Sequence, residues 1–392
     1  MQYLLNTYAR FDVQFEKGMS ATLWDKNGES YIDFTSGIGV VSVGHGNERL
    51  ANVICNQAKN IIHISNLYRI EPQERLAEEI VKKSGIEGGI FFCNSGAEAN
   101  ETALKIARKY GEVNGEIKRY KVITLENSFH GRTISTLKAT GQPKFHQYFG
   151  PFPDGFTYAK NIADIYNKID DKTVAVMIEL IQGEGGVNPF DKEEIQNLAK
   201  FLKEKNILLI VDEVQTGIYR TGEFLASNLY EIVPDIVTMA KGLGGGVPIG
   251  AVLTTHTDVL KPGDHGSTFG GNYLATAAAL EVVKILDEEK RNGKLEDTIE
   301  YFENRLLEIA KEYPDMFESV SGYGLMRALR AKTPEIRDEI VKKAFENKLL
   351  ILKAGTHSVR FLPPLTISKD EIDEGFERLK TALNTLENKI EN

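Results

Sequence analysis

The middle of the chain alternates short apolar runs with longer segments in which apolar residues recur every three or four positions. Six runs are too continuously apolar for a sheet with one face in water, which indicates buried strands. They cover 89–93, 120–126, 173–180, 207–214, 235–240 and 250–255. Helical patterns such as 98–111 and 192–206 lie between them. This order predicts an α/β fold with a mostly parallel sheet and helices on both faces.

The two ends of the chain have a different pattern, with short strands, turns and long amphipathic helices. The last helix is predicted to begin with a capping box formed by Ser368 and Glu371. Its apolar residues form a stripe with four- and three-residue spacing: Ile372, Phe376, Leu379, Leu383, Leu386 and Ile390. A coiled-coil seam has such a stripe, but on one short helix it more often packs into a core. We therefore predict a large domain over 51–284 and a smaller α+β domain built from 1–50 and 285–392.

Charge and composition narrow the classes of partner. The 392 residues carry a net charge of −9, which argues against nucleic acid and anionic membranes. No apolar run approaches the roughly 20 residues of a membrane span. The N-terminus lacks a basic segment followed by an apolar one, and the only cysteines, Cys55 and Cys93, form no C-x-x-C motif. We expect a cytoplasmic protein with neither nucleic acid nor membrane as partner.

Candidate chemistry collects after the predicted strands, where open α/β sheets bind ligands. Ser95 and Gly96 follow the first strand and precede a helix, so their N–H groups suit a phosphate, although a plain serine cap explains them too. Phe129 and Arg132 follow the second strand. The ring suits either the core or a ligand platform. The guanidinium suits a substrate carboxylate or a surface ion pair.

Two charged residues end the fourth and fifth strands. Asp212 comes directly after five apolar residues and needs a hydrogen-bonding or cationic partner. Lys241 lies 29 positions later (241 − 212), one βα unit along, so both side chains can face one cavity. Five glycines follow Lys241 within 242–250, and we expect them to keep the backbone close to a ligand.

Other kinds of site fit these residues poorly. A P-loop has its lysine after the glycines, whereas Lys241 precedes them. Asp212 and Glu213 point to opposite faces of a strand, unlike a glycosidase pair. The seven histidines form no H-E-x-x-H motif, so we predict no metal site. A phosphate-binding turn, an aromatic ring, a buried carboxylate and a lysine amine together favour pyridoxal phosphate.

Seven segments carry a resemblance to a known family: 95–100 (SGAEAN), 129–133 (FHGRT), 182–187 (QGEGGV), 212–217 (DEVQTG), 240–251 (AKGLGGGVPIGA), 265–272 (HGSTFGGN) and 359–365 (VRFLPPL). In this order and register they resemble the class III, fold type I aminotransferases, which depend on pyridoxal 5′-phosphate. The resemblance extends from about residue 5 to about residue 385. Tyr219 and Tyr273 depart from the usual family pattern, and we expect them to affect the substrate entrance or an interface.

The resemblance implies roles for particular residues. Catalysis would rest on Lys241, which bonds covalently to the cofactor, and on Asp212, which holds its ring nitrogen. The implied cofactor-binding residues also include Ser95, Gly96, Ala97, Phe129, Val214, Gln215 and Thr268. Thr268 would reach the phosphate of a neighbouring subunit, which implies a homodimer with shared active sites. The implied substrate-binding residues are Arg132, Ser267, Glu184 and Arg360, with Glu184 pairing with Arg360 while the ω-amine substrate is bound.

The resemblance also implies a reaction in which N-acetylornithine donates its ω-amino group to 2-oxoglutarate, as in arginine biosynthesis. Related donors remain open at this stage: ornithine, succinylornithine, acetyl-lysine and 4-aminobutyrate. An aminomutase or racemase on the same fold is a rival enzyme class, and a non-catalytic binding protein is a rival of another kind. The presence of both Lys241 and Asp212 disfavours a non-catalytic protein, and the Glu184 and Arg360 matches favour a transaminase.

Overall fold

A seven-stranded sheet forms the centre of the larger part of the molecule. The computed structural model describes residues 3–112 and 118–390, with side chains of the last helix as far as Glu387. The strand order is β4 (Gly89–Cys93), β12 (Gly250–Thr254), β11 (Ile236–Met239), β10 (Leu208–Asp212), β7 (Thr173–Ile178), β5 (Lys121–Leu125) and β6 (Phe156–Ala159). Neighbours from β11 to β6 are parallel, whereas β12 is antiparallel to both β11 and β4. The predicted mostly parallel α/β sheet is confirmed, and β6 is a strand that the apolar pattern missed.

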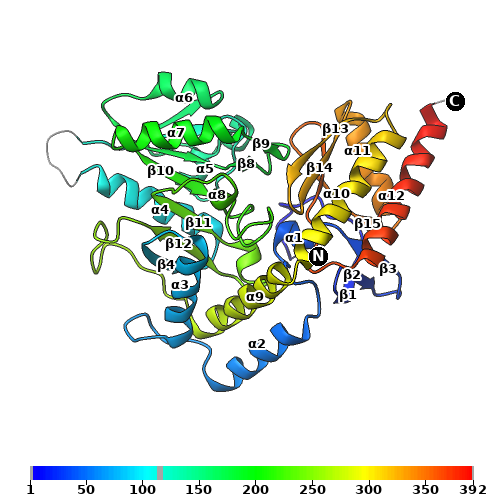
Figure 1. Ribbon diagram of the computed structural model, residues 1–392, viewed down its shortest axis with the longest axis horizontal. Helices are drawn as coiled ribbons and strands as arrows, with labels where there is room; N and C mark the ends of the chain where they lie inside the picture. Colours follow the sequence, from blue (N-terminus) through cyan, green and yellow to red (C-terminus); the bar gives the residue numbers. More distant parts are fainter. Residues whose placement is uncertain (1–2, 113–117, 391–392) are drawn as a thin grey trace.

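Helices pack around this sheet and connect it to the rest of the chain (Figure 1). They are α2 (Glu48–Asn60), α3 (Glu71–Ser84), α4 (Gly96–Tyr110), α5 (Ile134–Ala139), α6 (Ile162–Lys168), α7 (Lys192–Glu204), α8 (Ala226–Leu229) and α9 (Tyr273–Arg291). The short elements near the strand ends are η1 (Pro143–Phe145), β8 (Ile181–Gln182), β9 (Asn188–Pro189) and η2 (Lys241–Leu243). None of the helices in the described residues is long and apolar enough to cross a membrane.

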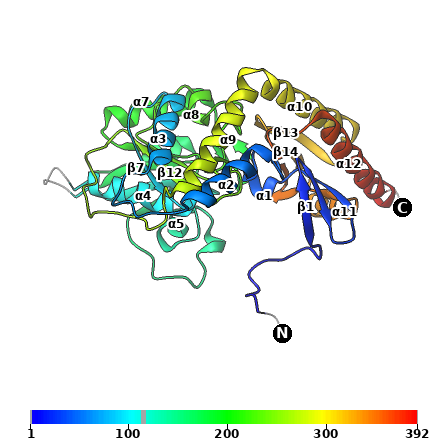
Figure 2. The ribbon, with the colours of Figure 1, turned by 90° about the horizontal axis from the view of Figure 1, so that it is seen from below.

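The chain ends build two small sheets beside the large one. One contains β1 (Phe15–Met19), β2 (Thr22–Asp25), β3 (Ser30–Asp33) and β15 (Leu349–Leu350). The other contains β13 (Phe317–Tyr323), β14 (Met326–Ala331), β17 (Ser358–Phe361) and β16 (Leu352–Ala354). Helices α10 (Lys294–Glu312), α11 (Pro334–Glu346) and α12 (Lys369–Ile390) pack against them, and α1 (Ser36–Gly39) follows β3. Figure 2 shows β1 and the segment before it extending away from the body.

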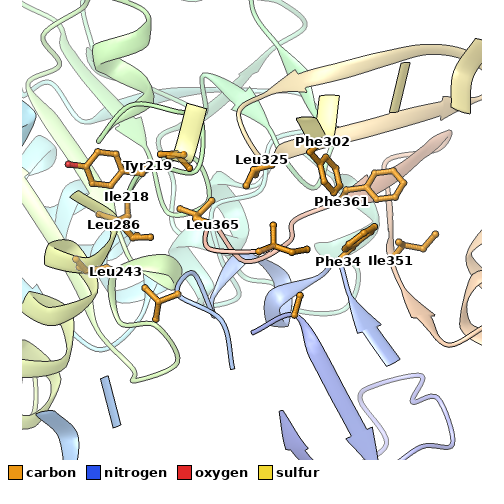
Figure 3. Close-up of a cluster of buried hydrophobic side chains, with 14 of the residues drawn as sticks. Phe34, Ile218, Tyr219, Leu243, Leu286, Phe302, Leu325, Ile351, Phe361 and Leu365 are labelled. Carbon is orange, nitrogen blue, oxygen red and sulfur yellow. The ribbon is translucent and has the colours of Figure 1, made fainter. Parts of the chain in front are cut away.

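One hydrophobic cluster runs through both parts of the molecule (Figure 3). Ile218 and Leu243 belong to the larger part, whereas Phe34, Phe302 and Phe361 belong to the chain ends. The two predicted domains therefore share apolar packing. Their predicted boundaries, 50/51 and 284/285, fall inside α2 and α9, and residues 1–2 and 391–392 lie outside the described residues.

The last helix follows its sequence prediction closely. The N–H of Glu371 donates to Ser368 Oγ (3.2 Å) and the N–H of Ser368 donates to the Glu371 carboxylate (3.1 Å), which is the expected capping box. The apolar stripe from Ile372 to Leu386 is buried in the core rather than exposed as a seam. The side chain of Ile390 lies outside the described residues.

Candidate active site

A cavity of about 410 Å³ lies beyond the carboxyl ends of the central strands. Ten of the residues singled out in the sequence line it: Ser95, Gly96, Ala97, Phe129, Arg132, Glu184, Asp212, Val214, Gln215 and Lys241. Strands β10 and β11 are adjacent and parallel, which brings Asp212 and Lys241 to the same wall, as their spacing predicts.

The partly buried Lys241 begins η2 with a left-handed backbone (φ 42°), a conformation that non-glycine residues rarely adopt and that often marks a functional position. Within the described residues its amine has no hydrogen bond or ion pair. Burial lowers the pKa of this amine, and that effect outweighs the neighbouring Glu184 carboxylate, which would raise it. The neutral, nucleophilic form of the Lys241 amine is therefore more accessible in the cavity than it is in water.

The glycines after Lys241 meet packing requirements in addition to the role we expected. A Cβ on Gly244 would lie 2.0 Å from the Val247 carbonyl oxygen, and one on Gly245 would lie 2.7 Å from the Val282 side chain on α9. A Cβ on Gly242 would meet nothing closer than 3.6 Å. The loop needs Gly244 to turn and Gly245 to pack against α9. Gly246 lines the cavity and a Cβ on it would meet nothing within 4 Å, so closeness of this backbone to a ligand stays a prediction.

Asp212 ends β10 as a buried carboxylate with several hydrogen-bond donors. Its Oδ1 accepts from the Val214 N–H (3.0 Å), and its Oδ2 accepts from Asn100 Nδ2 (2.7 Å) and His130 Nδ1 (2.8 Å). The adjacent Glu213 faces the other way and accepts from the N–H groups of Ala226 and Ser227 at the start of α8. The prediction that the two acids point to opposite faces is therefore confirmed.

Glu184 and Arg360 form an ion pair, with Arg360 Nη1 2.8 Å from Glu184 Oε1. The Arg360 side chain is 2% exposed and the Glu184 side chain 31% exposed, so Glu184 is the partner with room to move. Burial alone would raise the pKa of Glu184, but the Arg360 charge and hydrogen bond lower it below the usual range. Gln215 Oε1 also accepts from Arg360 Nη1, at 3.2 Å.

Arg132 is held by aromatic rings rather than by a carboxylate. Its guanidinium carbon lies 4.2 Å from the centre of the Phe145 ring and 5.5 Å from that of Phe129. The side chain is exposed, and no carboxylate among the described residues pairs with it. Its donors are consequently free for an anionic ligand.

Ser267, Thr268 and Arg360 lie outside the cavity lining of this chain, and Arg360 reaches it through Glu184. Ser267 Oγ is engaged by Asn94 Nδ2 (3.2 Å) and by the Gly270 N–H (3.0 Å). Thr268 is exposed. Tyr219 is buried and donates its hydroxyl to Asp287 on α9 (2.9 Å), so it plays no part at the cavity entrance.

Among the cavity residues that were not singled out in the sequence, three are buried and polar. They are Asn100 on α4, His130 beside Phe129, and Glu179 after β7. Glu179 is buried and accepts from the N–H groups of Phe129 (3.0 Å) and Gly183 (3.3 Å). All three lie in or next to motifs that carry the family resemblance, so their position in those motifs was the available signal.

The residues of the cavity fit pyridoxal phosphate. The first N–H groups of α4, at Gly96 and Ala97, line the cavity at a helix N-terminus, where a phosphate binds favourably. A Cβ on Gly96 would lie 2.7 Å from Val214, so only glycine allows these two segments to approach so closely. A lysine amine with no partner among the described residues and a carboxylate on the same wall complete the set of groups that this cofactor needs.

Comparisons with known proteins agree with this assignment. The family model described as "Aminotransferase class-III" matches residues 4–383. An acetylornithine aminotransferase from Wolinella succinogenes is 60% identical over 383 residues, covering 97% of this chain and 98% of the relative. The crystal structure of the ornithine aminotransferase from Toxoplasma gondii ME49 matches with a TM-score of 0.93 and 34% identity, covering 99% of this chain and 94% of that one.

A second solved structure, N-acetylornithine aminotransferase from Stenotrophomonas maltophilia K279a, matches with a TM-score of 0.83 and 33% identity. It covers 97% of each chain. Sequence family, fold and cavity thus agree over nearly the whole length. The chain belongs to the class-III aminotransferase family and is a pyridoxal-phosphate-dependent transaminase.

Proposed function

We propose that this enzyme transfers the ω-amino group of N-acetylornithine to 2-oxoglutarate, giving N-acetylglutamate semialdehyde and glutamate. The observation that carries the proposal is the ion pair between Glu184, which lines the cavity, and the buried Arg360 behind it, with Arg360 Nη1 2.8 Å from Glu184 Oε1. One site must accept a donor whose reacting carbon carries no carboxylate and then an acceptor whose reacting carbon carries one. A buried arginine that an acid can cover or uncover meets both requirements. The names of the relatives from Wolinella and Stenotrophomonas support the same donor.

The bound cofactor supplies an aldehyde that carries the amino group and a ring that withdraws electrons from the reacting carbon. We assign the phosphate to the Ser95–Ala97 turn and the ring to the space between Phe129 and Val214. Gln215 would bind the ring oxygen, and Asp212 the ring nitrogen.

Lys241 moves the proton in this scheme. Its amine, whose pKa is lowered by burial, can accept a proton at Nζ from the amine-bearing carbon of the substrate and return it. Arg132 would bind the α-carboxylate of the donor, because its guanidinium has no carboxylate partner among the described residues. Arg360 would bind the α-carboxylate of 2-oxoglutarate once Glu184 swings away.

The proposal includes a homodimer with shared active sites. Thr268 is exposed and lies outside the cavity of its own chain, as a residue serving a neighbouring subunit would. The segment after α2 presents exposed apolar side chains, with Leu67 87% and Tyr68 63% exposed, and Phe269 beside Thr268 is 60% exposed. Asn66 ties that segment to the Thr268 loop by donating to the Ser267 and Gly270 carbonyls. We also propose that residues 51–284 and the two chain ends form separate domains.

A panel of amine donors tests the function, with 2-oxoglutarate as acceptor and glutamate formation as the readout. We expect N-acetylornithine to give the highest kcat/KM. Ornithine is the second candidate, because the ornithine aminotransferase from Toxoplasma gondii matches with a TM-score of 0.93. A Lys241→Ala chain is the control and should form no glutamate. Activity with ornithine but none with N-acetylornithine would refute the proposed donor.

A further inference from the structure

Asn100 lies at a polar junction between three elements of the large sheet region. It belongs to α4 and is 1% exposed. Its Nδ2 donates to Asp212 Oδ2 at the end of β10 (2.7 Å) and to the His130 carbonyl oxygen (2.7 Å). Its Oδ1 accepts from the hydroxyl of Thr238 on β11 (2.7 Å). All three of its partner residues are buried.

The partners of Asn100 allow only one orientation of its amide. A carbonyl oxygen can only accept a hydrogen bond, so the amide atom beside the His130 carbonyl must be the nitrogen. That same nitrogen faces Asp212, and it therefore always presents a donor to the carboxylate. On the opposite side Thr238 donates to the amide oxygen, which opposes rotation of the amide.

The result is a fixed distribution of donors around Asp212. Asn100 and His130 both donate to Oδ2, whereas Val214 alone donates to Oδ1. Each carboxylate oxygen accepts about two hydrogen bonds in its plane. Oδ2 is thus saturated, and Oδ1 keeps one acceptor position. Thr238 is the register partner of Asp212 on the neighbouring strand β11. The backbone pairing of β10 and β11 therefore fixes the Thr238 hydroxyl and the Asp212 carboxylate relative to each other.

We propose that Asn100, oriented by Thr238, is a positioning residue that saturates Oδ2 of Asp212 and leaves Oδ1 as the acceptor for the cofactor. The hydroxyl of Thr238 acts on the Asp212 carboxylate only through Asn100. The inference rests on the proposed role of Asp212 toward the cofactor, and it is independent of which amine is the donor.

Thr238→Val tests this inference in the loaded dimer by removing one hydroxyl at nearly constant shape. We expect the midpoint of the pH titration of the cofactor's visible absorbance to shift. We also expect kcat to fall about 10-fold while KM for the amine donor changes less than about 3-fold, since hydrogen bonds to charged networks have about this effect. Thr238→Ser keeps the hydroxyl and should restore wild-type values.

Thr173→Val is the matched control. Thr173 is a buried threonine at the start of β7, which is separated from β11 by β10. Its hydroxyl donates to Asp170 Oδ1 (3.0 Å) at the amino end of the strand, away from the cavity. It should leave the absorbance midpoint and kcat unchanged. A Thr238→Val chain with the same midpoint and kcat as the Thr173→Val chain would overturn the inference.

A double variant separates action through Asn100 from a general weakening of the fold. We expect Asn100→Leu to lower kcat about 100-fold, and Thr238→Val to add no further loss in the Asn100→Leu background. If the losses in kcat caused by the two substitutions multiply, Thr238 does not act through Asn100 and the inference is refuted. If Asn100→Leu does not fold, the comparison of Thr238→Val, Thr238→Ser and Thr173→Val decides alone. If the wild-type protein binds pyridoxal phosphate without a visible band, the proposed function fails and this inference falls with it. A normal wild-type band with an unaffected Thr238→Val variant refutes the inference only.

Discussion

Two buried arginines, Arg220 and Arg360, occupy contrasting environments in this molecule. Arg220 donates through Nη1 to the carbonyl oxygens of Leu325 (3.0 Å) and Pro363 (2.6 Å), and no carboxylate in the described part of the chain pairs with it. Arg360 instead pairs with Glu184 at the cavity. Burial lowers the pKa of Arg220 to about 9, whereas the Glu184 carboxylate compensates the charge of Arg360.

The difference lies in what each partner is able to do. The carbonyls that hold Arg220 belong to the backbone beside the shared hydrophobic cluster, where Figure 3 places Leu325 between the two groups of core side chains. They cannot leave without moving the chain. Glu184 is a partly exposed side chain and can rotate away. A buried arginine bound by backbone fixes a fold, whereas one bound by a movable acid can serve a ligand.

Arg220→Met gives the largest expected effect. It leaves two buried carbonyl oxygens without a donor, and we expect the free energy of unfolding to fall by about 4 kcal/mol. Urea unfolding measures this change. Arg360→Met should cost less than half as much, because Glu184 can turn toward solvent. Equal destabilisation by the two substitutions would remove the distinction between them.

Glu179 adds a pH dependence to the charges at the cavity. Burial raises the pKa of Glu179 from its usual value of about 4.5 to about 7. Between these values the folded protein binds a proton that the unfolded chain does not bind, so stability falls as pH rises from about 4.5 to about 7. The contribution amounts to at most about 3 kcal/mol. The free energy of unfolding of the cofactor-free protein, measured with urea at several pH values in this range, should depend less on pH for Glu179→Gln than for the wild type. The same pH dependence in both proteins would contradict the prediction.

Glu184→Gln tests whether the acid conceals Arg360 from the amine donor. Without a carboxylate beside it, Arg360 stays charged and unpaired while the donor is bound, at a cost of about 2 kcal/mol. We expect KM for N-acetylornithine to rise about 30-fold, with KM for 2-oxoglutarate nearly unchanged. Steady-state kinetics with each substrate varied in turn provides the measurement. A larger effect on 2-oxoglutarate would reverse the assignment.

Arg360→Lys gives the smallest expected effect. The positive charge remains, but the planar pair of donors is lost, which costs about 1 kcal/mol. KM for 2-oxoglutarate should rise about 5-fold, and the free energy of unfolding should change by less than about 1 kcal/mol. If KM for 2-oxoglutarate rises as much as it does with a neutral residue at position 360, the geometry of the donors, rather than the charge, governs this position.

Much of the fold could be predicted from the sequence, because apolar runs such as 207–211 and 173–178 mark buried strands directly. The direction of β12 could not be predicted, because an apolar run does not reveal whether a strand is parallel or antiparallel to its neighbours. Only the connection between the strands decides the direction. Strand β6 was missed because it is a partly exposed edge strand of four residues, FTYA.

The candidate site was predictable where chemistry and spacing coincide, as with Asp212 and Lys241 on adjacent strands. Asn100 was not predicted as a site residue, because the local sequence of an amphipathic helix does not show which groups a polar residue in it contacts. Its importance arises from partners at 130, 212 and 238, which only the folded chain brings together. The contacts that require Gly244 and Gly245 could not be predicted either, because they involve Val247 and Val282 in the folded chain.

The central claim is that Arg360 serves one half of the reaction and is covered by Glu184 in the other. The most direct measurement is the single-turnover rate of each half-reaction in an Arg360→Ala chain, followed by the cofactor's absorbance. We predict that the apparent affinity for 2-oxoglutarate weakens about 30- to 1000-fold, corresponding to a lost charge-assisted contact of about 2–4 kcal/mol. The half-reaction with N-acetylornithine should change much less, because its α-carboxylate rests on Arg132. Equal damage to both half-reactions would contradict the claim.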